Sequence, residues 1–169
     1  MEEKLWNEIK DNSEYSNNKE LYQNHILEQY KMYVEMADRI SSRRNLANAF
    51  FLSINSTILG SVAFLFDKIQ LVQPKWIIIS PIIGTLLLCL IWWWLLSSYR
   101  KLNTAKYKVV GQLEKRLPAS PYWSAEWYEL GEGKDPEKYL PLTALEKWIP
   151  MIFASTYIMI AVYVAVLMK

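Results

Sequence analysis

The stretch WIIISPIIGTLLLCLIWWWLLSS, residues 76–98, decides the fold of this chain. It contains no charged residue, and a helix of this length spans the roughly 30 Å of a bilayer's hydrocarbon core at about 1.5 Å per residue. Two further apolar runs flank it, at 47–66 and 149–168. The sequence therefore predicts an all-α integral membrane protein with three transmembrane helices.

The overall composition is an average over two kinds of segment, apolar and charge-rich. The chain has 169 residues, of which 52% are hydrophobic, and very apolar spans alternate with charge-rich segments. The net charge of +2 does not favour nucleic acid as a partner. Three spans form a small bundle with much surface facing lipid, so a polar task inside the membrane would require several copies. Cys89 is the only cysteine, which excludes a disulfide within the chain.

The expected organisation has six segments. These are a polar N-terminal segment at 1–18, a cytoplasmic amphipathic helix at 19–46, spans at 47–66 and 76–98, a cytoplasmic helix with an aromatic loop at 99–143, and a third span at 144–168. Apolar and tyrosine side chains recur every three or four residues from Tyr22 to Ile40, which is the pattern of an amphipathic helix. No Gly or Pro interrupts 19–59. We therefore expect the first two membrane helices to extend into the cytoplasm as a helical hairpin.

The segment between the second and third spans is rich in Pro, Gly and aromatic residues. Aromatic side chains are rarely left in water at this density, so we expect Trp123, Trp127 and Tyr139 to be buried against the cytoplasmic stems. Thr143 and Glu146 have the spacing of a capping box, which predicts that the third helix starts at Ala144. Pro150 lies within that helix and should bend it.

The basic residues predict the orientation. Arg39, Arg43 and Arg44 precede the first span and a second basic cluster at 100–108 follows the second span, whereas the link at 67–75 carries two lysines. By the positive-inside rule the N-terminus and the 99–143 segment face the cytoplasm, and the C-terminus lies on the other side of the membrane. Tryptophan favours the two membrane interfaces. The expected anchors are Trp76 at the outer interface and Trp92, Trp93, Trp94 and Trp148 at the inner one.

The first span carries an unusual polar stripe. Arg44, Asn48 and Asn55 lie within about 40° of one another on a helix with 100° per residue. Asparagine in hydrocarbon is costly unless it is paired or wetted. Two interpretations remain open: copies of the stripe line a water-filled pore, or they form an amide network between subunits. Both imply self-association.

A second polar face lies on the opposite side of the first span. Ser53, Thr57 and Ser61 recur every fourth residue, which is the spacing of a small-residue face suited to close helix packing. We expect this face to pack against the second span of the same chain, near Gly84.

The sequence offers little for catalysis. His25 is the only histidine, so neither a metal site nor a Ser-His-Asp or Cys-His arrangement is expected. The glycines at 131–133 lack the spacing and the Ser or Thr of a phosphate-binding loop. The sequence therefore predicts a protein that is not an enzyme, with no metal and no cofactor.

Three stretches carry a resemblance to known proteins: YKMYVEMADRISSRRNLANAFFLSIN at 30–55, YRKLNTAKYKVVGQLEKRLPASPYWSAEW at 99–127, and GKDPEKYLPLTALEKWIP at 133–150. They resemble a family of small bacterial inner-membrane proteins of unassigned biochemistry. The layout over 20–110, a cytoplasmic helix leading into a close pair of spans, also looks like SLATT-type effector domains. Those domains accompany nucleotide-signalling antiphage systems and are thought to form pores that depolarise the membrane.

The resemblance implies a homo-oligomeric effector in the bacterial inner membrane that forms a pore or perturbs the bilayer in antiphage defence. Its partners would be other copies of itself, the lipid bilayer, and a cytoplasmic defence partner or nucleotide signal received by the cytoplasmic stem and loop. The alternative is a non-conducting membrane anchor or sensor that recruits a cytoplasmic partner. Both hypotheses place the N-terminus in the cytoplasm and the C-terminus in the periplasm.

Overall fold

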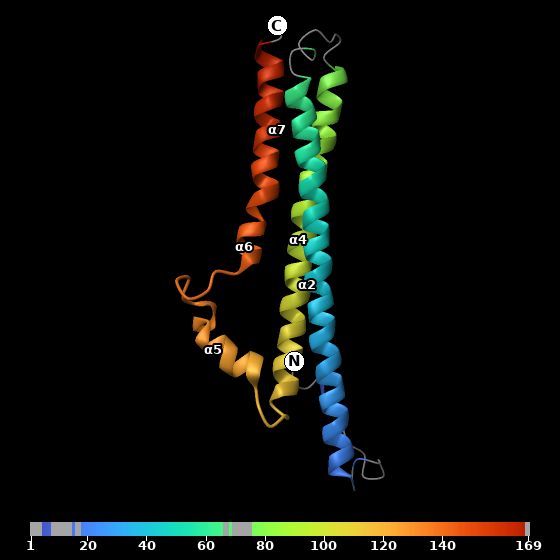
Figure 1. Ribbon diagram of the computed structural model, residues 1–169, viewed down its shortest axis with the longest axis vertical. Coiled ribbons are helices and arrows are strands. Elements are labelled where there is room, and N and C mark those ends of the chain that lie inside the picture. Colours follow the sequence, from blue (N-terminus) through green and yellow to red (C-terminus); the bar gives the residue numbers. More distant parts are fainter. Residues whose placement is uncertain (1–4, 8–14, 16–17, 66–67, 69–75, 168–169) are drawn as a thin grey trace. The chain divides into compact units, whose positions relative to one another are not determined.

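The computed structural model describes residues 5–7, 15, 18–65, 68 and 76–167, and all regular elements among them are helical. Two long helices, α2 (Lys19–Phe64) and α4 (Trp76–Glu114), are followed by a chain of short elements and a final helix (Figure 1). The short elements are the π-helical turn η1 (Pro121–Glu126), α5 (Trp127–Glu129), the 3₁₀ turn η2 (Gly131–Gly133) and α6 (Leu142–Glu146), and the final helix is α7 (Trp148–Leu167). Within this part of the chain α2, α4 and α7 are long and apolar enough to cross a membrane. The expected all-α, three-span fold is confirmed.

Helix α2 runs for 46 residues without a break. It begins directly after Asn18, whose side-chain oxygen accepts a hydrogen bond from the backbone N–H of Leu21 at 2.9 Å. This bond satisfies one of the free N–H groups that every helix start exposes. Most of the polar segment 1–18 and of the link at 67–75 lies outside the described residues.

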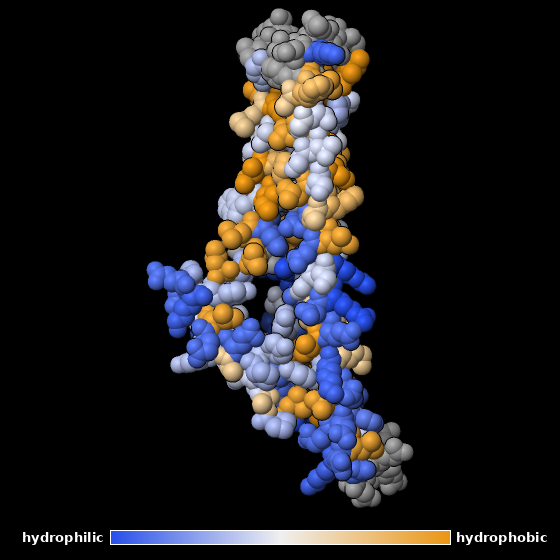
Figure 2. All heavy atoms as spheres, viewed as in Figure 1, coloured by the Kyte–Doolittle hydropathy of each residue, from blue (hydrophilic) through white to orange (hydrophobic). Residues whose placement is uncertain are grey.

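Contacts divide the chain into two compact units. The membrane unit consists of Arg43–Arg100 and Pro141–Lys169, and the stem unit consists of Met1–Ser42 and Lys101–Leu140. Hydrophobic residues predominate on the visible surface of the membrane unit, whereas the stem unit is mostly hydrophilic with scattered apolar side chains (Figure 2). An apolar exterior is what lipid or another copy of the chain would face.

The membrane unit is a three-helix bundle with two clusters in its interior. In the first cluster the rings of Phe51 and Trp92 stack with their centroids 5.7 Å apart, and Phe153 of α7 packs against Trp92. The second cluster joins Ile82 and Cys89 of α4 to Tyr157 of α7. Helix α7 therefore lies against α2 and α4 within this unit (Figure 1).

The third helix begins differently from the sequence-based expectation. Its N-cap residue is Pro141, and α6 starts at Leu142, so Thr143 lies inside the first turn instead of capping it. The expected capping box is wrong, because Glu146 is directed to Arg44 rather than back to the helix start. The expected bend is present as a break at Lys147, since Pro150 has no N–H to donate to the carbonyl of Glu146.

In the stem unit the amphipathic stripe of α2 is directed to α4, since the hydroxyl of Tyr30 donates to Glu114. Ile26, Ala37 and Ile40 of α2 are buried, and so are Val110 and Leu113 of α4. The stripe continues through polar contacts, since the ammonium of Lys106 lies 4.9 Å from the centre of the Tyr33 ring.

A single carboxylate, that of Glu114, fixes the start of the aromatic loop. Glu114 is buried and accepts hydrogen bonds from the hydroxyls of Tyr30 and Ser120 and from the backbone N–H groups of Tyr122 and Trp123, at 2.7–3.1 Å. Burial, together with the hydrogen bond to Glu114, raises the pKa of the Tyr30 hydroxyl above its usual range. These four donors explain why a buried charge is tolerated at this position.

The loop aromatics are less buried than the sequence predicts. Trp123, Trp127 and Tyr139 remain 40%, 41% and 38% exposed, so the expectation of substantial burial is wrong. Trp123 lies flat on α4 over Gly111, where any Cβ would come within 2.5 Å of the indole ring. All three aromatic side chains are therefore partly accessible to solvent.

Candidate functional site

The stripe on α2 that the sequence singled out faces the interior of the membrane unit. Asn55 is fully buried, and its side-chain N–H donates to the carbonyl of Phe51 at 2.8 Å. Its side-chain oxygen lies 3.5 Å from the Sγ of Cys89, which donates to it, and the hydroxyl of Tyr157 donates to its backbone carbonyl at 3.2 Å. Asn55 therefore joins all three helices of one subunit.

Asn48, two turns earlier, also bonds to α4. Its side-chain oxygen accepts a hydrogen bond from the indole N–H of Trp92 at 2.9 Å. Trp92 is completely buried between Phe51 and Phe153, so its expected role as an interface anchor is wrong. An indole N–H buried in an apolar core needs an acceptor, and Asn48 supplies it.

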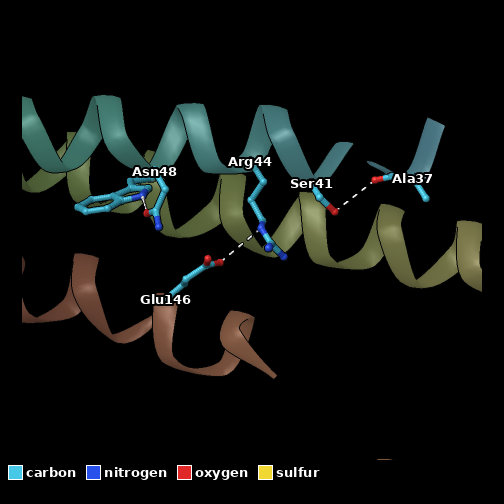
Figure 3. A network of polar contacts seen from close by, with 6 residues as sticks. Ala37, Ser41, Arg44, Asn48 and Glu146 are labelled. Carbon is cyan, nitrogen blue, oxygen red and sulfur yellow. Dashed lines mark hydrogen bonds and ion pairs between the residues drawn. The ribbon is translucent and has the colours of Figure 1, made fainter. Parts of the chain in front are cut away.

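Arg44 completes the stripe with an ion pair to Glu146 of α6 (Figure 3). The two side chains point toward each other, with Nε and Oε2 3.5 Å apart, and their side chains are only 14% and 13% exposed. Both atoms are buried and make no hydrogen bond within the described residues. The pair is thus a charge contact held at more than hydrogen-bond distance, largely shielded from water.

Arg44, Asn48 and Asn55 form one row of inward-facing polar residues, here called the seam. The seam holds α2 to α4, α6 and α7. The sequence left open whether they line a pore or join subunits. In this structure their polar atoms are directed to partners within their own chain. The partners Cys89, Tyr157 and Glu146 were not identified from sequence, since each lies on another helix and no local spacing connects it to α2.

The hydroxyl face of α2 takes the opposite position. Ser53, Thr57 and Ser61 are exposed, and so is Gly84 of α4, so the expected packing between this face and the second span of the same chain is wrong. The hydroxyls of Thr57 and Ser61 donate to the carbonyls four residues earlier, at 2.8 and 2.9 Å. They need no partner from another helix, and an outward position therefore costs little.

The remaining tryptophans fit an interfacial position. Trp93, Trp94 and Trp148 are exposed on the membrane unit, and the ammonium of Lys147 lies 6.0 Å from the centre of the Trp93 ring. The side chain of Trp76 lies outside the described residues. An exposed indole beside a lysine suits the headgroup level of a bilayer.

In the part of the chain that the structure describes, no three His, Cys, Asp or Glu side chains are grouped so that they could hold a metal ion. Asn48, Asn55 and Arg44 contact side chains of the neighbouring helices, which is the chemistry of helix association.

Comparison with known proteins gives one finding. Searches of curated proteins and of solved structures found no match. The model of the octameric membrane protein family matches residues 27–166, which include both units and all three spans. The three-span fold and this match over most of its length show that the chain belongs to the octameric membrane protein family.

Proposed function

We propose that the chain assembles as a homo-octamer in a bacterial inner membrane and opens a path through the bilayer as an effector of antiphage defence. The observation that carries the proposal is the three-span chain's membership of a family described as octameric. The apolar exterior of the membrane unit suits contact with other copies and with lipid.

The membrane restricts the symmetry of such an assembly. All copies of one chain insert with the same orientation, because the same basic segments stay on the same side. A dihedral octamer would need half of the copies to be inverted. Eight copies therefore form a cyclic ring around an axis normal to the membrane.

A ring of eight encloses an opening that its own side chains do not close. Helices that contact each other at roughly 9 Å between axes place eight axes about 12 Å from the centre of a ring. Subtracting a helix radius of about 5 Å leaves an opening of roughly 7 Å radius or more. Water, lipid or a moving element must fill it, which is why an octamer favours a path-forming role over a solid bundle.

The outward polar groups of α2 are suited to line that path. Thr57 and Ser61 expose hydroxyl-bearing side chains at mid-span. The exposed large side chains of α7, by contrast, are mostly apolar, and they include Ile152, Met159 and Val162. We therefore place α7 toward lipid and the Thr57–Ser61 edge of α2 toward the axis.

Reconstitution in liposomes tests the proposal. The wild-type particle should have the mass of eight 19.9 kDa subunits and should release a trapped small ion when its trigger is present. Thr57→Val removes a hydroxyl without changing shape and should lower the flux while the particle keeps its mass. Ser155→Ala is the matched control, because Ser155 of α7 makes the same bond to the carbonyl four residues earlier at 2.9 Å. An octamer that conducts no ions under any trigger would overturn the path-forming role.

The second candidate function is a non-conducting anchor or sensor. The exposed aromatic loop favours it, because Tyr128 is 71% exposed and its neighbours Trp123 and Trp127 are 40% and 41% exposed. Such a surface suits a cytoplasmic partner or a nucleotide base, either of which could also be the trigger of the effector. Loss of phage protection in a Trp127→Ala variant that keeps its ion flux would favour this recruiting role.

The proposed orientation has its own test. Reporter fusions at the N-terminus should be active only in the cytoplasm, and fusions at Lys169 only in the periplasm. A cytoplasmic reporter that is active at Lys169 would contradict the topology. We further propose that the chain acts without catalysis, through assembly alone.

A further inference from the structure

Two glycines of the membrane unit face outward into open space. A Cβ built on Gly60 of α2 or on Gly84 of α4 meets no atom within 4 Å. Glycine weakens a helix interior relative to alanine, and neither residue is needed for a close contact inside the subunit. Such positions suit the close approach of a helix from outside.

The two glycines lie at the same height along the bundle. The hydrogen bond between Cys89 and Asn55 fixes the register of α2 against α4, which run antiparallel. Gly60 lies five residues after Asn55 and Gly84 five residues before Cys89, so both are displaced by about 7.5 Å in the same direction. Subunits related by an axis normal to the membrane contact each other at equal heights.

The residues around the two glycines form two matching ridges with the same spacing. The α2 ridge consists of Ala49, Ser53, Ser56 and Gly60, and the α4 ridge consists of Ser80, Gly84, Leu87 and Ile91. The four residues of each ridge span about 60° around the axis of their helix. All of them are exposed.

The side chains at equal heights are complementary in size. Ser53, two residues before Asn55, is level with Ile91, two residues after Cys89. Phe64 is 89% exposed beside the end of the α2 ridge and is level with Ser80. A large side chain on one helix thus meets a small one on the other, with the two glycines between these pairs.

From this arrangement we infer that the α2 ridge of one subunit packs against the α4 ridge of the next copy and closes the ring. A cyclic ring requires two different patches on each subunit, one for each neighbour, and the two ridges are different surfaces of one chain. The inference rests on the proposed octamer and specifies which helices hold it together.

Cysteine pairs test the contact in the membrane. In a Cys89→Ser background, mild oxidation of a Gly60→Cys, Gly84→Cys double variant should give a ladder of disulfide-linked species up to the full ring. Either single variant should stay monomeric on a denaturing gel, because the two cysteines of a contact come from different positions. The pair Gly60→Cys, Ile83→Cys is the matched control, since Ile83 is exposed at nearly the same height on another face of α4.

The outcomes separate the inference from the proposed function. Dimers from one single variant would mean that two identical faces meet, and an absence of links in both pairs would mean that lipid covers the ridges. Either result overturns the inference, whereas the particle mass of the wild type reports the octamer independently. Gly60→Leu should reduce the particle from eight subunits to fewer than eight without lowering the unfolding temperature of the detergent-solubilised monomer, since the space at Gly60 is open and leucine favours a helix more than glycine does. An intact octamer in this variant would also contradict the contact.

Discussion

The two polar faces of α2 within the membrane unit carry similar numbers of polar side chains but point in opposite directions. The seam of Arg44, Asn48 and Asn55 is turned inward, and the hydroxyl face is exposed. The difference is chemical: a guanidinium or a side-chain amide has several donors and acceptors that its own helix cannot satisfy, so it requires a partner on another helix. A serine or threonine hydroxyl bonds to its own helix and is free to face outward.

The largest effect should come from separating the charges of the inward seam. Glu146→Leu leaves the guanidinium of Arg44 buried without its carboxylate, which should lower the free energy of unfolding by about 3 kcal/mol. Replacing both residues, as Arg44→Met with Glu146→Leu, should recover most of that loss because no unpaired charge remains. Unfolding in detergent followed by tryptophan fluorescence measures both variants.

The control for this prediction is the exposed pair of Arg39 and Glu35 in the stem unit. Its atoms are closer, at 2.6 Å, but the two side chains are 68% and 62% exposed. Glu35→Leu should therefore change the stability by no more than about 0.5 kcal/mol. If the losses in unfolding free energy of Arg44→Met and Glu146→Leu simply add in the double variant, the two residues do not act as a pair.

The next largest effect is expected at Glu114 of the stem unit, whose carboxylate also depends on hydrogen-bond donors from other segments. Glu114→Gln replaces one carboxylate oxygen by an NH₂ group that faces donors in either orientation of the amide, because both oxygens accept bonds. We expect a loss of about 2 kcal/mol and faster amide hydrogen exchange at Tyr122 and Trp123. Tyr30→Phe removes one of the four donors and should cost about half as much. Unchanged exchange at both amides would show that Glu114 does not hold the loop.

A smaller effect is expected at the neutral part of the seam. Asn48→Leu leaves the indole N–H of Trp92 without its acceptor, and Trp92→Phe leaves the Asn48 oxygen without its donor. A double-mutant cycle should give a coupling of roughly 0.6–1.7 kcal/mol, the range of hydrogen bonds between membrane helices. Coupling near zero would mean that water or lipid satisfies either group equally well.

The same chemistry explains how far the sequence could predict this molecule. Apolar length sufficed to predict α2, α4 and α7 as helices, because the need to satisfy backbone hydrogen bonds in a membrane leaves few alternatives to a helix. The polar stripe was singled out because charged and amide side chains are rare in a span. Their direction was not predicted, because helical spacing shows which residues share a face and not what that face contacts.

The start of the third helix shows the same limit. Thr143 and Glu146 satisfy a local capping pattern, but the carboxylate of Glu146 is directed to Arg44, 102 residues earlier in the chain. A local motif contributes about 1 kcal/mol, whereas a buried guanidinium without a partner costs about 3 kcal/mol or more. The ion pair with Arg44 therefore prevails over the capping box. A sequence window around Thr143 does not include Arg44, so local spacing could not predict this outcome.

The smallest effect tests what determines the energetic difference between the two faces: the need of a polar group for a partner on another helix, or burial itself. Thr85 is buried in the membrane unit, yet its hydroxyl donates to the carbonyl of Ile82 in its own helix at 2.8 Å, so it combines an inward position with a self-satisfied group. If the need for a partner decides the energetics, Thr85→Val should be nearly as silent as Thr57→Val, with changes within about 0.5 kcal/mol. If burial itself decides them, Thr85→Val should shift the stability clearly while Thr57→Val does not. Unfolding of both variants as detergent-solubilised monomers makes this measurement, and a loss at Thr85 as large as that at Asn48 would break the comparison between the two faces of α2.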